Sequence, residues 1–116
     1  MAHEPSRIRL LMANEPRAYR EVIAEAMHEL RPALVIMTVE PEDMDGSVAS
    51  FGPDIVICSA VTDLVESEVL AWVELYPEYG PQSVISVKGE VSKVNEIQLA
   101  DLLCVVDRAE RLLQKG

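Results

Sequence analysis

Short apolar runs alternate along this chain with longer segments in which apolar residues recur at helical spacing. The runs are Ile8–Ala13, Ala33–Val39 and Ile55–Ala60, and the third is the most apolar of them. Runs of this length are typical of strands that are covered on both faces of a sheet. Parallel neighbours need a crossover of roughly a dozen residues or more, usually a helix. The alternation therefore predicts an α/β fold with a doubly wound, mostly parallel sheet.

Four helices are predicted from apolar residues spaced three and four apart. They cover Pro16–Leu30, Glu42–Phe51, a segment from Asp63 to about Tyr76, and about Glu96 to Gln114. In the third of these the buried stripe comprises Val65, Val69, Trp72, Val73 and Tyr76.

Two further strands are predicted at Ser83–Val87 and Val91–Val94. Only Lys88-Gly89-Glu90 separate them, which is too short for a parallel crossover. We therefore expect a hairpin that turns at these residues, with a short antiparallel fifth strand at the edge. The expected strand order is 2-1-3-4-5, with no helix between the fourth and fifth strands.

Length and charge limit the classes of partner. The chain has 116 residues and a formal net charge of −10, which fits one domain over residues 7–116 after a flexible N-terminus at residues 1–6. This charge disfavours nucleic acid and anionic membranes as partners. With no apolar signal core and no apolar stretch of ~18 residues, the expected location is the cytoplasm. Cys58 and Cys104 are interpreted as small buried hydrophobic residues, not as a disulfide.

Two segments resemble response-regulator receiver domains. Ala13-Asn14-Glu15-Pro16, followed by Arg20-Glu21, resembles the Asp-Asp-Glu-Pro opening of that family. Pro53-Asp54-Ile55-Val56-Ile57-Cys58-Ser59 resembles the stretch that ends in its phosphoacceptor aspartate. The resemblance covers about residues 7–87 and implies a flavodoxin-like domain for signal transduction. The helix that usually follows the fourth strand in receivers is missing here.

The residues that carry receiver chemistry are not preserved at the matching positions. Ala13 and Asn14 stand where the acidic pair would lie, and Ser59 stands at the acceptor aspartate. Glu15 keeps a carboxylate, and Lys88 falls near the family's Thr or Ser position. Mg²⁺ prefers carboxylate oxygens, and a serine cannot form the reactive acyl phosphate. The resemblance therefore implies a degenerate pseudo-receiver that lacks a catalytic residue, a metal and a cofactor.

The function expected on these grounds is a phosphorylation-independent signalling module that acts by binding other proteins. Asn14, Glu15, Ser59 and Lys88 would line its vestigial pocket. The alternative is a sensor that binds a small molecule in the crevice at the carboxyl edge of the sheet, where doubly wound folds place ligands. An enzyme is not expected, because His3 and His28 are not positioned to activate Ser59.

The last predicted helix carries a wide apolar stripe. Leu102, Val105 and Leu112 extend it beyond what one core contact requires. A broadened stripe of this kind favours contact with a partner helix. These residues are therefore the predicted interaction face, and a homodimer through the last helix is the expected assembly, with the identity of other protein partners left open.

Overall fold

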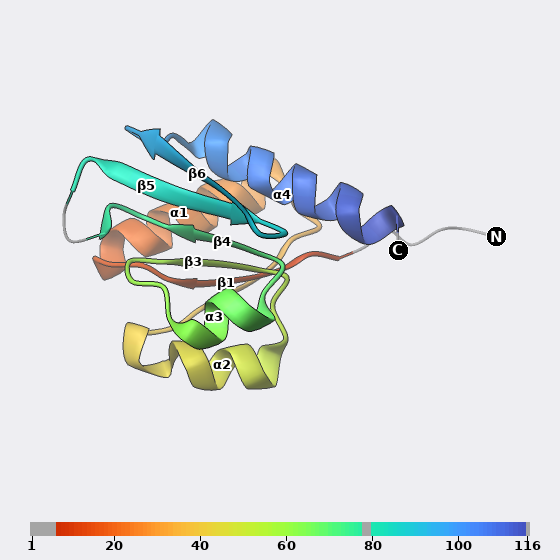
Figure 1. Ribbon diagram of the computed structural model, residues 1–116, viewed down its shortest axis with the longest axis horizontal. Coiled ribbons are helices and arrows are strands. Elements are labelled where there is room, and N and C mark those ends of the chain that lie inside the picture. The colour runs from red at the N-terminus through yellow and green to blue at the C-terminus, as the bar shows by residue number, and fades with distance from the viewer. Residues whose placement is uncertain (1–6, 78–79, 116) are drawn as a thin grey trace.

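The computed structural model describes residues 7–77 and 80–115, so the predicted flexible segment at residues 1–6 and His3 lie outside it. Strands and helices alternate through the first two thirds of the chain, and two strands and a long helix complete it (Figure 1). The elements are β1 (Arg9–Ala13), α1 (Arg17–Leu30), β2 (Val35–Thr38), the 3₁₀ turn η1 (Pro41–Asp43), α2 (Met44–Phe51), β3 (Ile55–Cys58), α3 (Asp63–Glu68), β4 (Ala71–Glu74), β5 (Gln82–Val87), β6 (Glu90–Asn95) and α4 (Leu99–Lys115).

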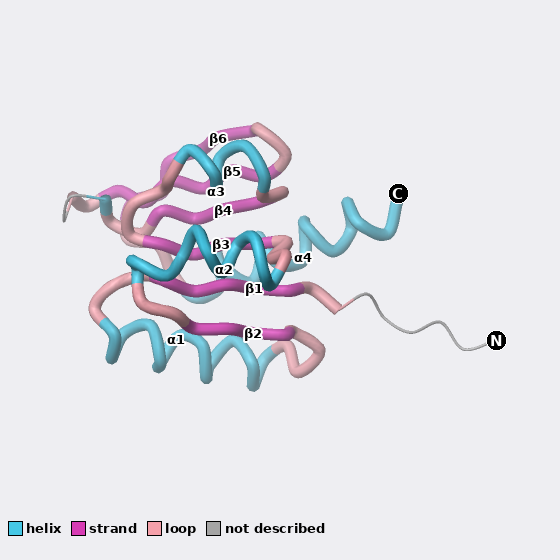
Figure 2. The backbone as a smooth tube through the Cα atoms, turned by 90° about the horizontal axis from the view of Figure 1, so that it is seen from below, coloured by secondary structure: helices cyan, strands magenta, loops and turns pink. Residues whose placement is uncertain are grey.

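The six strands form one mixed sheet in the order β2-β1-β3-β4-β5-β6, as Figure 2 shows. The pairs among β2, β1, β3 and β4 are parallel. β5 is antiparallel to both β4 and β6. The predicted α/β class and the hairpin are confirmed. The predicted order lacks one strand, because β4 lies between the third predicted strand and the fourth, and the fourth predicted strand (β5) is antiparallel to its neighbour.

The segment predicted as one helix from Asp63 to Tyr76 contains both a helix and a strand. α3 ends at Glu68, and the extended backbone of Val69 (φ −107°, ψ 133°) leads into β4. Trp72 contributes to the core on one face of the sheet, and Val73 to the core on the other. The seven residues between β4 and β5 are too few for a parallel crossover, so β5 runs antiparallel.

Helices cover both faces of the sheet. α1 and α4 pack on one face, and α2 and α3 pack on the other, in front of the strands in Figure 2. Alternate side chains of each strand point to opposite faces of the sheet and so pack into different cores. The core under α1 and α4 includes Leu10, Met12, Ile55, Ile57, Val73, Ile23, Met27, Val105 and Ala109, and the core under α2 and α3 includes Leu11, Val56, Cys58, Trp72, Met44, Val48 and Val65.

The predicted interaction face on the last helix is wrong. Leu102 and Val105 are 4% and 2% exposed, and Leu112 is partly buried against the same core. α4 lies over the sheet and also beside α1, which buries a wide stripe. The basis for a homodimer through this face is thereby removed.

The two cysteines differ in their environment. Cys58 is buried as predicted, but Cys104 is exposed on α4, and both are free thiols. In the part of the chain that the structure describes, no helix has the length and apolar character needed to cross a bilayer.

Candidate functional site

The structure brings together three of the four residues predicted to line the vestigial pocket. Asn14 and Glu15 follow β1, and Ser59 follows β3, at the carboxyl edge of two strands that pair in parallel. The backbone N–H of Glu15 donates a hydrogen bond of 2.9 Å to the Ser59 hydroxyl oxygen. This bond joins the loops after β1 and β3.

Lys88 lies at the other edge of the sheet, so its predicted place in that pocket is wrong. It follows Val87, which pairs with Ala71 at the start of β4. Ala71 pairs in turn with Ile55 at the start of β3. The end of β5 therefore lies where the parallel strands begin, because β5 runs in the opposite direction to them.

Asn14 lies in the core at this carboxyl edge. Its side chain is fully buried, and neither its amide nitrogen nor its amide oxygen has a hydrogen-bond partner among the described residues. The carboxylate-bearing Glu15 next to it is exposed. Burial of an unpaired amide is unfavourable, so Asn14 marks a position with unused hydrogen-bonding capacity.

Arg20, which was not predicted as a site residue, is buried beside Asn14. Only 2% of Arg20 is exposed, and its guanidinium donates to the Asn14 carbonyl oxygen (3.3 Å) and to the Glu40 carboxylate (2.5 Å). The sequence spacing could have indicated that Arg20 is buried, because Ile23 and Met27 follow it three and seven residues later on the buried face of α1. Arg20 and Glu40 tie α1 to the loop after β2.

Cys58 and Glu74 end β3 and β4 at the same edge. Burial, reinforced by the nearby Glu74 carboxylate, raises the pKa of the Cys58 thiol to about 12. Glu74 accepts a hydrogen bond of 2.8 Å from the backbone N–H of Val61. Cys58 is therefore a neutral thiol at physiological pH. Across residues 7–77 and 80–115, no three His, Cys, Asp or Glu side chains gather as metal ligands would.

An apolar groove, which we call the α1–α4 groove, runs between the first three turns of α1 and the start of α4, including the two residues before it. Its volume is about 230 Å³. Tyr76 donates from its hydroxyl to the Ile97 carbonyl oxygen at 3.4 Å, at one end of the groove. Partial burial beside Tyr76 raises the pKa of Tyr19. The lining residues are Tyr19, Val22, Ile23, Ala26, Ile97, Gln98, Leu99 and Leu102.

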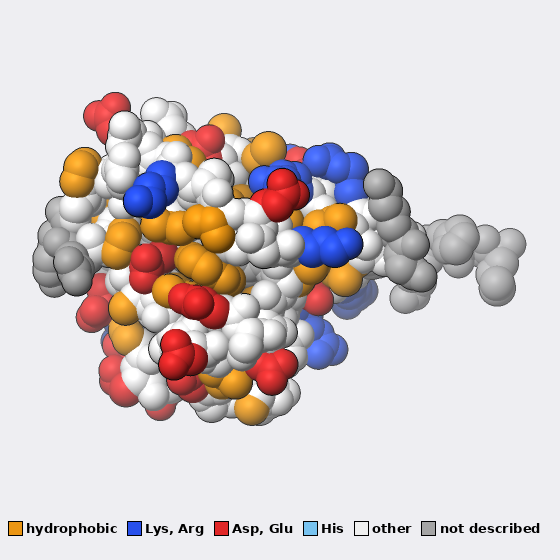
Figure 3. Space-filling model, in the orientation of Figure 1, with side chains coloured by type: hydrophobic (Ala, Val, Ile, Leu, Met, Phe, Trp, Pro, Cys, Tyr) orange, Lys and Arg blue, Asp and Glu red, His pale blue; other side chains and the backbone are white. Residues whose placement is uncertain are grey.

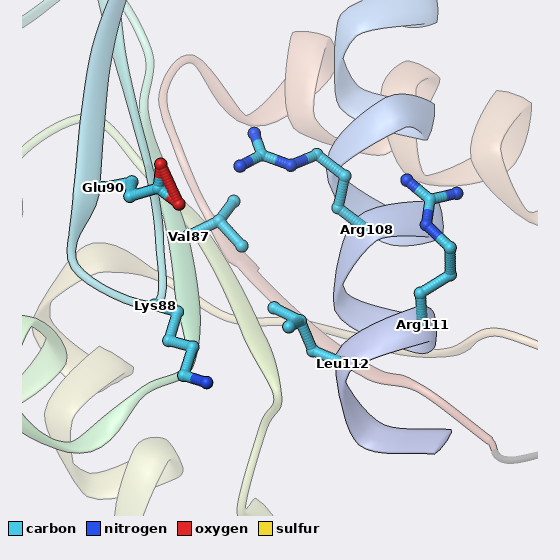
Figure 4. A pocket seen from close by; sticks show the side chains of 6 residues that line it. All are labelled: Val87, Lys88, Glu90, Arg108, Arg111 and Leu112. Atoms are coloured by element: carbon cyan, nitrogen blue, oxygen red, sulfur yellow. The ribbon is translucent and has the colours of Figure 1, made fainter. Parts of the chain in front are cut away.

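A second pocket, which we call the cationic pocket, lies at the amino edge between the β5–β6 turn and the end of α4. Its volume is about 180 Å³. Val87, Lys88 and Glu90 line it from the hairpin, and Arg108, Arg111 and Leu112 line it from α4 (Figure 4). In Figure 3, Lys and Arg side chains gather near this end of the molecule, whereas Asp and Glu predominate over α2 and α3.

Comparison of the chain with protein-family models, with curated proteins and with solved structures found no match. The assignment of a function to this fold therefore rests on its own residues.

Proposed function

We propose that this chain is a phosphorylation-independent protein-interaction module, a pseudo-receiver whose receiver-like part is its parallel half. The observation that carries this proposal is the α1–α4 groove, an apolar surface bordered by exposed side chains. At the carboxyl edge, the Ser59 hydroxyl bonds to the Glu15 backbone and Asn14 is fully buried. The Ser59 hydroxyl is thus engaged within the fold and Asn14 is not accessible from outside, so we assign recognition to the groove.

Exposed apolar side chains border the groove on α1. Tyr19 is 38% exposed and Val22 is 66% exposed, while Ile23 beneath them is buried. Contiguous apolar surface of this kind marks interaction sites on soluble proteins. A groove between two helices accommodates the apolar face of a third helix.

The occupant we propose is an amphipathic helix of a partner protein with basic residues along its flanks. Glu25 and Glu29 lie three and seven residues after Val22, on the same side of α1, and both are exposed. Basic side chains beside the docked apolar face would meet these carboxylates. A second copy of this chain fits less well, because two acidic rims would repel each other.

A synthetic peptide tests this proposal directly. An amphipathic helix of about 18 residues, with leucine on one face and lysine on the other, is titrated into the ¹⁵N-labelled protein. We expect saturable amide shifts at Tyr19, Val22 and Leu99. A peptide of the same composition in scrambled order, which has no apolar face, controls for attraction to the net charge of −10.

Two charge-matched variants locate the contact. Val22→Lys is expected to weaken binding of the ordered peptide about tenfold, because it places a charged ammonium group in the apolar contact. Val91→Lys is the control, because Val91 is 60% exposed on β6, outside the groove. Equal losses in both variants, or equal binding of the scrambled peptide, would refute docking in the groove.

Independence from phosphorylation is tested at the carboxyl edge. Amide spectra are recorded with Mg²⁺ and with beryllofluoride, an analogue of the phosphoryl group. We expect no shifts at Asn14, Glu15 and Ser59, because a receiver's metal ligands and acceptor carboxylate are replaced there. Saturable shifts at these three residues would contradict the proposal.

One observation favours the alternative, a small-molecule sensor at the carboxyl edge. Among the described residues, the buried amide of Asn14 has an unpaired donor and an unpaired acceptor. A bound small molecule could form hydrogen bonds with both. The sensor model predicts that Asn14→Leu abolishes binding of a small molecule whose shifts map to residues 14–20. The interaction module predicts that this substitution leaves peptide binding at the groove unchanged.

A further inference from the structure

The cationic pocket brings three positively charged side chains together from two distant parts of the sequence. Lys88 belongs to the β5–β6 turn, and Arg108 and Arg111 belong to α4. We propose that this pocket binds a phosphate group, as free phosphate or as a phosphomonoester. This inference does not depend on the function proposed for the α1–α4 groove.

Within the part of the chain that the structure describes, the cations of the pocket form no ion pair with a carboxylate. The ion pairs among residues 7–77 and 80–115 are Arg17–Glu21, Arg20–Glu40 and Arg31–Asp107. None of these pairs includes Lys88, Arg108 or Arg111. Their charged groups therefore retain hydrogen-bonding capacity for an external anion.

A carboxylate one turn before Arg111 on α4 is already engaged by another arginine. Asp107 lies one turn before Arg111, and it accepts two hydrogen bonds from Arg31, at 3.1 Å from Nε and 3.0 Å from Nη2. This bidentate pair holds Asp107 against the loop after α1. Arg111 itself is exposed at the rim of the cationic pocket.

The charge of the pocket contrasts with that of the whole chain. The protein carries 20 acidic and 10 basic residues, yet three basic side chains and one acidic side chain line this pocket. A surface of opposite sign to the rest of the molecule concentrates anions locally. The arrangement is therefore specific to this end of the molecule.

Pocket size and side-chain chemistry favour a single phosphate group. A volume of about 180 Å³ accommodates one such group and a small substituent. Guanidinium groups pair with two phosphate oxygens at once. Lys88 adds a positive charge at the rim, where Figure 4 shows its ammonium group pointing away from the two arginines. Figure 4 shows Arg108 and Glu90 pointing toward each other across the pocket. The Glu90 carboxylate disfavours an extended polyanion such as a nucleic-acid backbone, since it repels additional phosphates.

The test is a titration of the ¹⁵N-labelled protein with inorganic phosphate, at constant ionic strength set with chloride. Saturable amide shifts are expected at Lys88, Gly89 and Glu90 and around Arg108 and Arg111. The carboxyl-edge residues tested for the proposed function should not shift. The two proposals therefore fail independently, because their readouts lie at opposite edges of the sheet.

Substitutions distinguish specific binding in the pocket from general attraction of phosphate to surface cations. Arg108→Gln and Arg111→Gln should each weaken phosphate binding about fivefold. Arg17→Gln is the matched control, because Arg17 is an exposed arginine on α1 and the change in net charge is the same. Glu90→Gln should tighten binding about threefold by removing a repulsive charge. A structural role for Glu90 does not predict such a gain.

Two further ligands distinguish the source of the phosphate. Phosphoserine binding more tightly than inorganic phosphate would assign the pocket to a phosphomonoester, and equal affinities would assign it to free phosphate. Either ranking supports the inference. Acetate that shifts the same amides with the same affinity, or weakening by Arg17→Gln equal to that by Arg111→Gln, would overturn it.

Discussion

The two edges of the sheet use their polar side chains in different ways. At the carboxyl edge, Ser59 accepts a hydrogen bond from the Glu15 backbone, and Arg20 is buried between Asn14 and Glu40. At the amino edge, Arg108 and Arg111 face a pocket with no carboxylate bonded to them among the described residues. The comparison shows that Ser59 and Arg20 at the carboxyl edge are bonded within the fold, whereas the arginines at the amino edge are not.

This difference follows from the direction of β5. If the strand at residues 82–87 were parallel to β3, the residue that follows it, Lys88, would lie at the carboxyl edge near Ser59. Because β4 intervenes, the hairpin of β5 and β6 turns at the amino edge instead. Lys88 thereby lines the same pocket as the arginines of α4.

The largest expected contrast is in thiol reactivity. A buried thiol such as Cys58, whose pKa is raised to about 12, holds about a thousandfold less thiolate at neutral pH than an ordinary cysteine. At pH 8 one equivalent of a thiol-reactive disulfide should react rapidly with the folded protein, at the exposed Cys104. Cys104→Ser should remove this fast phase, and both thiols of the parent protein should react in urea. Fast reaction of two equivalents without urea would contradict a closed carboxyl edge.

Arginine substitutions at the two edges provide a matched test of stability. Arg20→Gln should lower the free energy of unfolding by about 2 kcal/mol, because it removes charge-assisted hydrogen bonds of a buried side chain. Arg108→Gln should change it by less than about 0.5 kcal/mol, as is usual for a surface residue. Urea unfolding measures both values. Equal losses in the free energy of unfolding would show that the arginines at the two edges do not differ in their contribution to stability.

The turn that forms the amino edge depends on Gly89. Lys88 and Gly89 have φ angles of 51° and 85°, as in the type I′ turns that connect hairpin strands. Gly89→Ala should cost about 1 kcal/mol, since a side chain is disfavoured at positive φ. Gly46→Ala is the control and should instead stabilise by about 0.5–1 kcal/mol, because Gly46 is helical and an added Cβ meets no atom within 4 Å. Thermal unfolding compares the two variants, and a loss in both would contradict the assigned turn.

The smallest expected effect concerns the pair that holds Asp107. The hydrogen bonds from Arg31 lower the pKa of the Asp107 carboxyl. The resulting stabilisation is complete above the ordinary pKa of an aspartate and is lost as the pH falls through the lowered pKa of the folded state. Because the side chain is 41% exposed, Asp107→Asn should cost only about 0.5 kcal/mol at pH 7.

A pH series of unfolding experiments checks this sign. The difference between the parent protein and Asp107→Asn should shrink as the pH is lowered below the ordinary range of aspartate. A difference that grows in acid would show that the pair does not stabilise the charged carboxylate.

Much of the fold could be predicted from local patterns. Ile8–Ala13, Ala33–Val39 and Ile55–Ala60 contain β1, β2 and β3, because apolar runs of this length fit a sheet covered on both faces. The spacing around Val65, Val69, Trp72 and Val73 was misleading, because it satisfies a helical stripe as well as a strand buried on both faces. A strand of four residues, such as β4, is too short for its periodicity to exclude a helix.

The site could be predicted only where it depends on neighbouring parallel strands. Asn14, Glu15 and Ser59 converge because β1 and β3 end at a shared edge. Arg20 and the cationic pocket were missed, because each joins residues whose proximity depends on how a helix lies on the sheet. Leu102 and Val105 were assigned to an interface because the sequence does not show that α4 packs against both the sheet and α1.

The sequence by itself determined the alternation of strands and helices, the hairpin that turns at Lys88-Gly89-Glu90, and the non-acidic side chains at Ala13, Asn14 and Ser59. These features follow from local composition and spacing. Only the tertiary structure decided the direction of β5, the burial of Arg20 and the grouping of Lys88 with Arg108 and Arg111. They depend on the pairing of β4 and on the packing of whole helices, which are long-range contacts that no local pattern specifies.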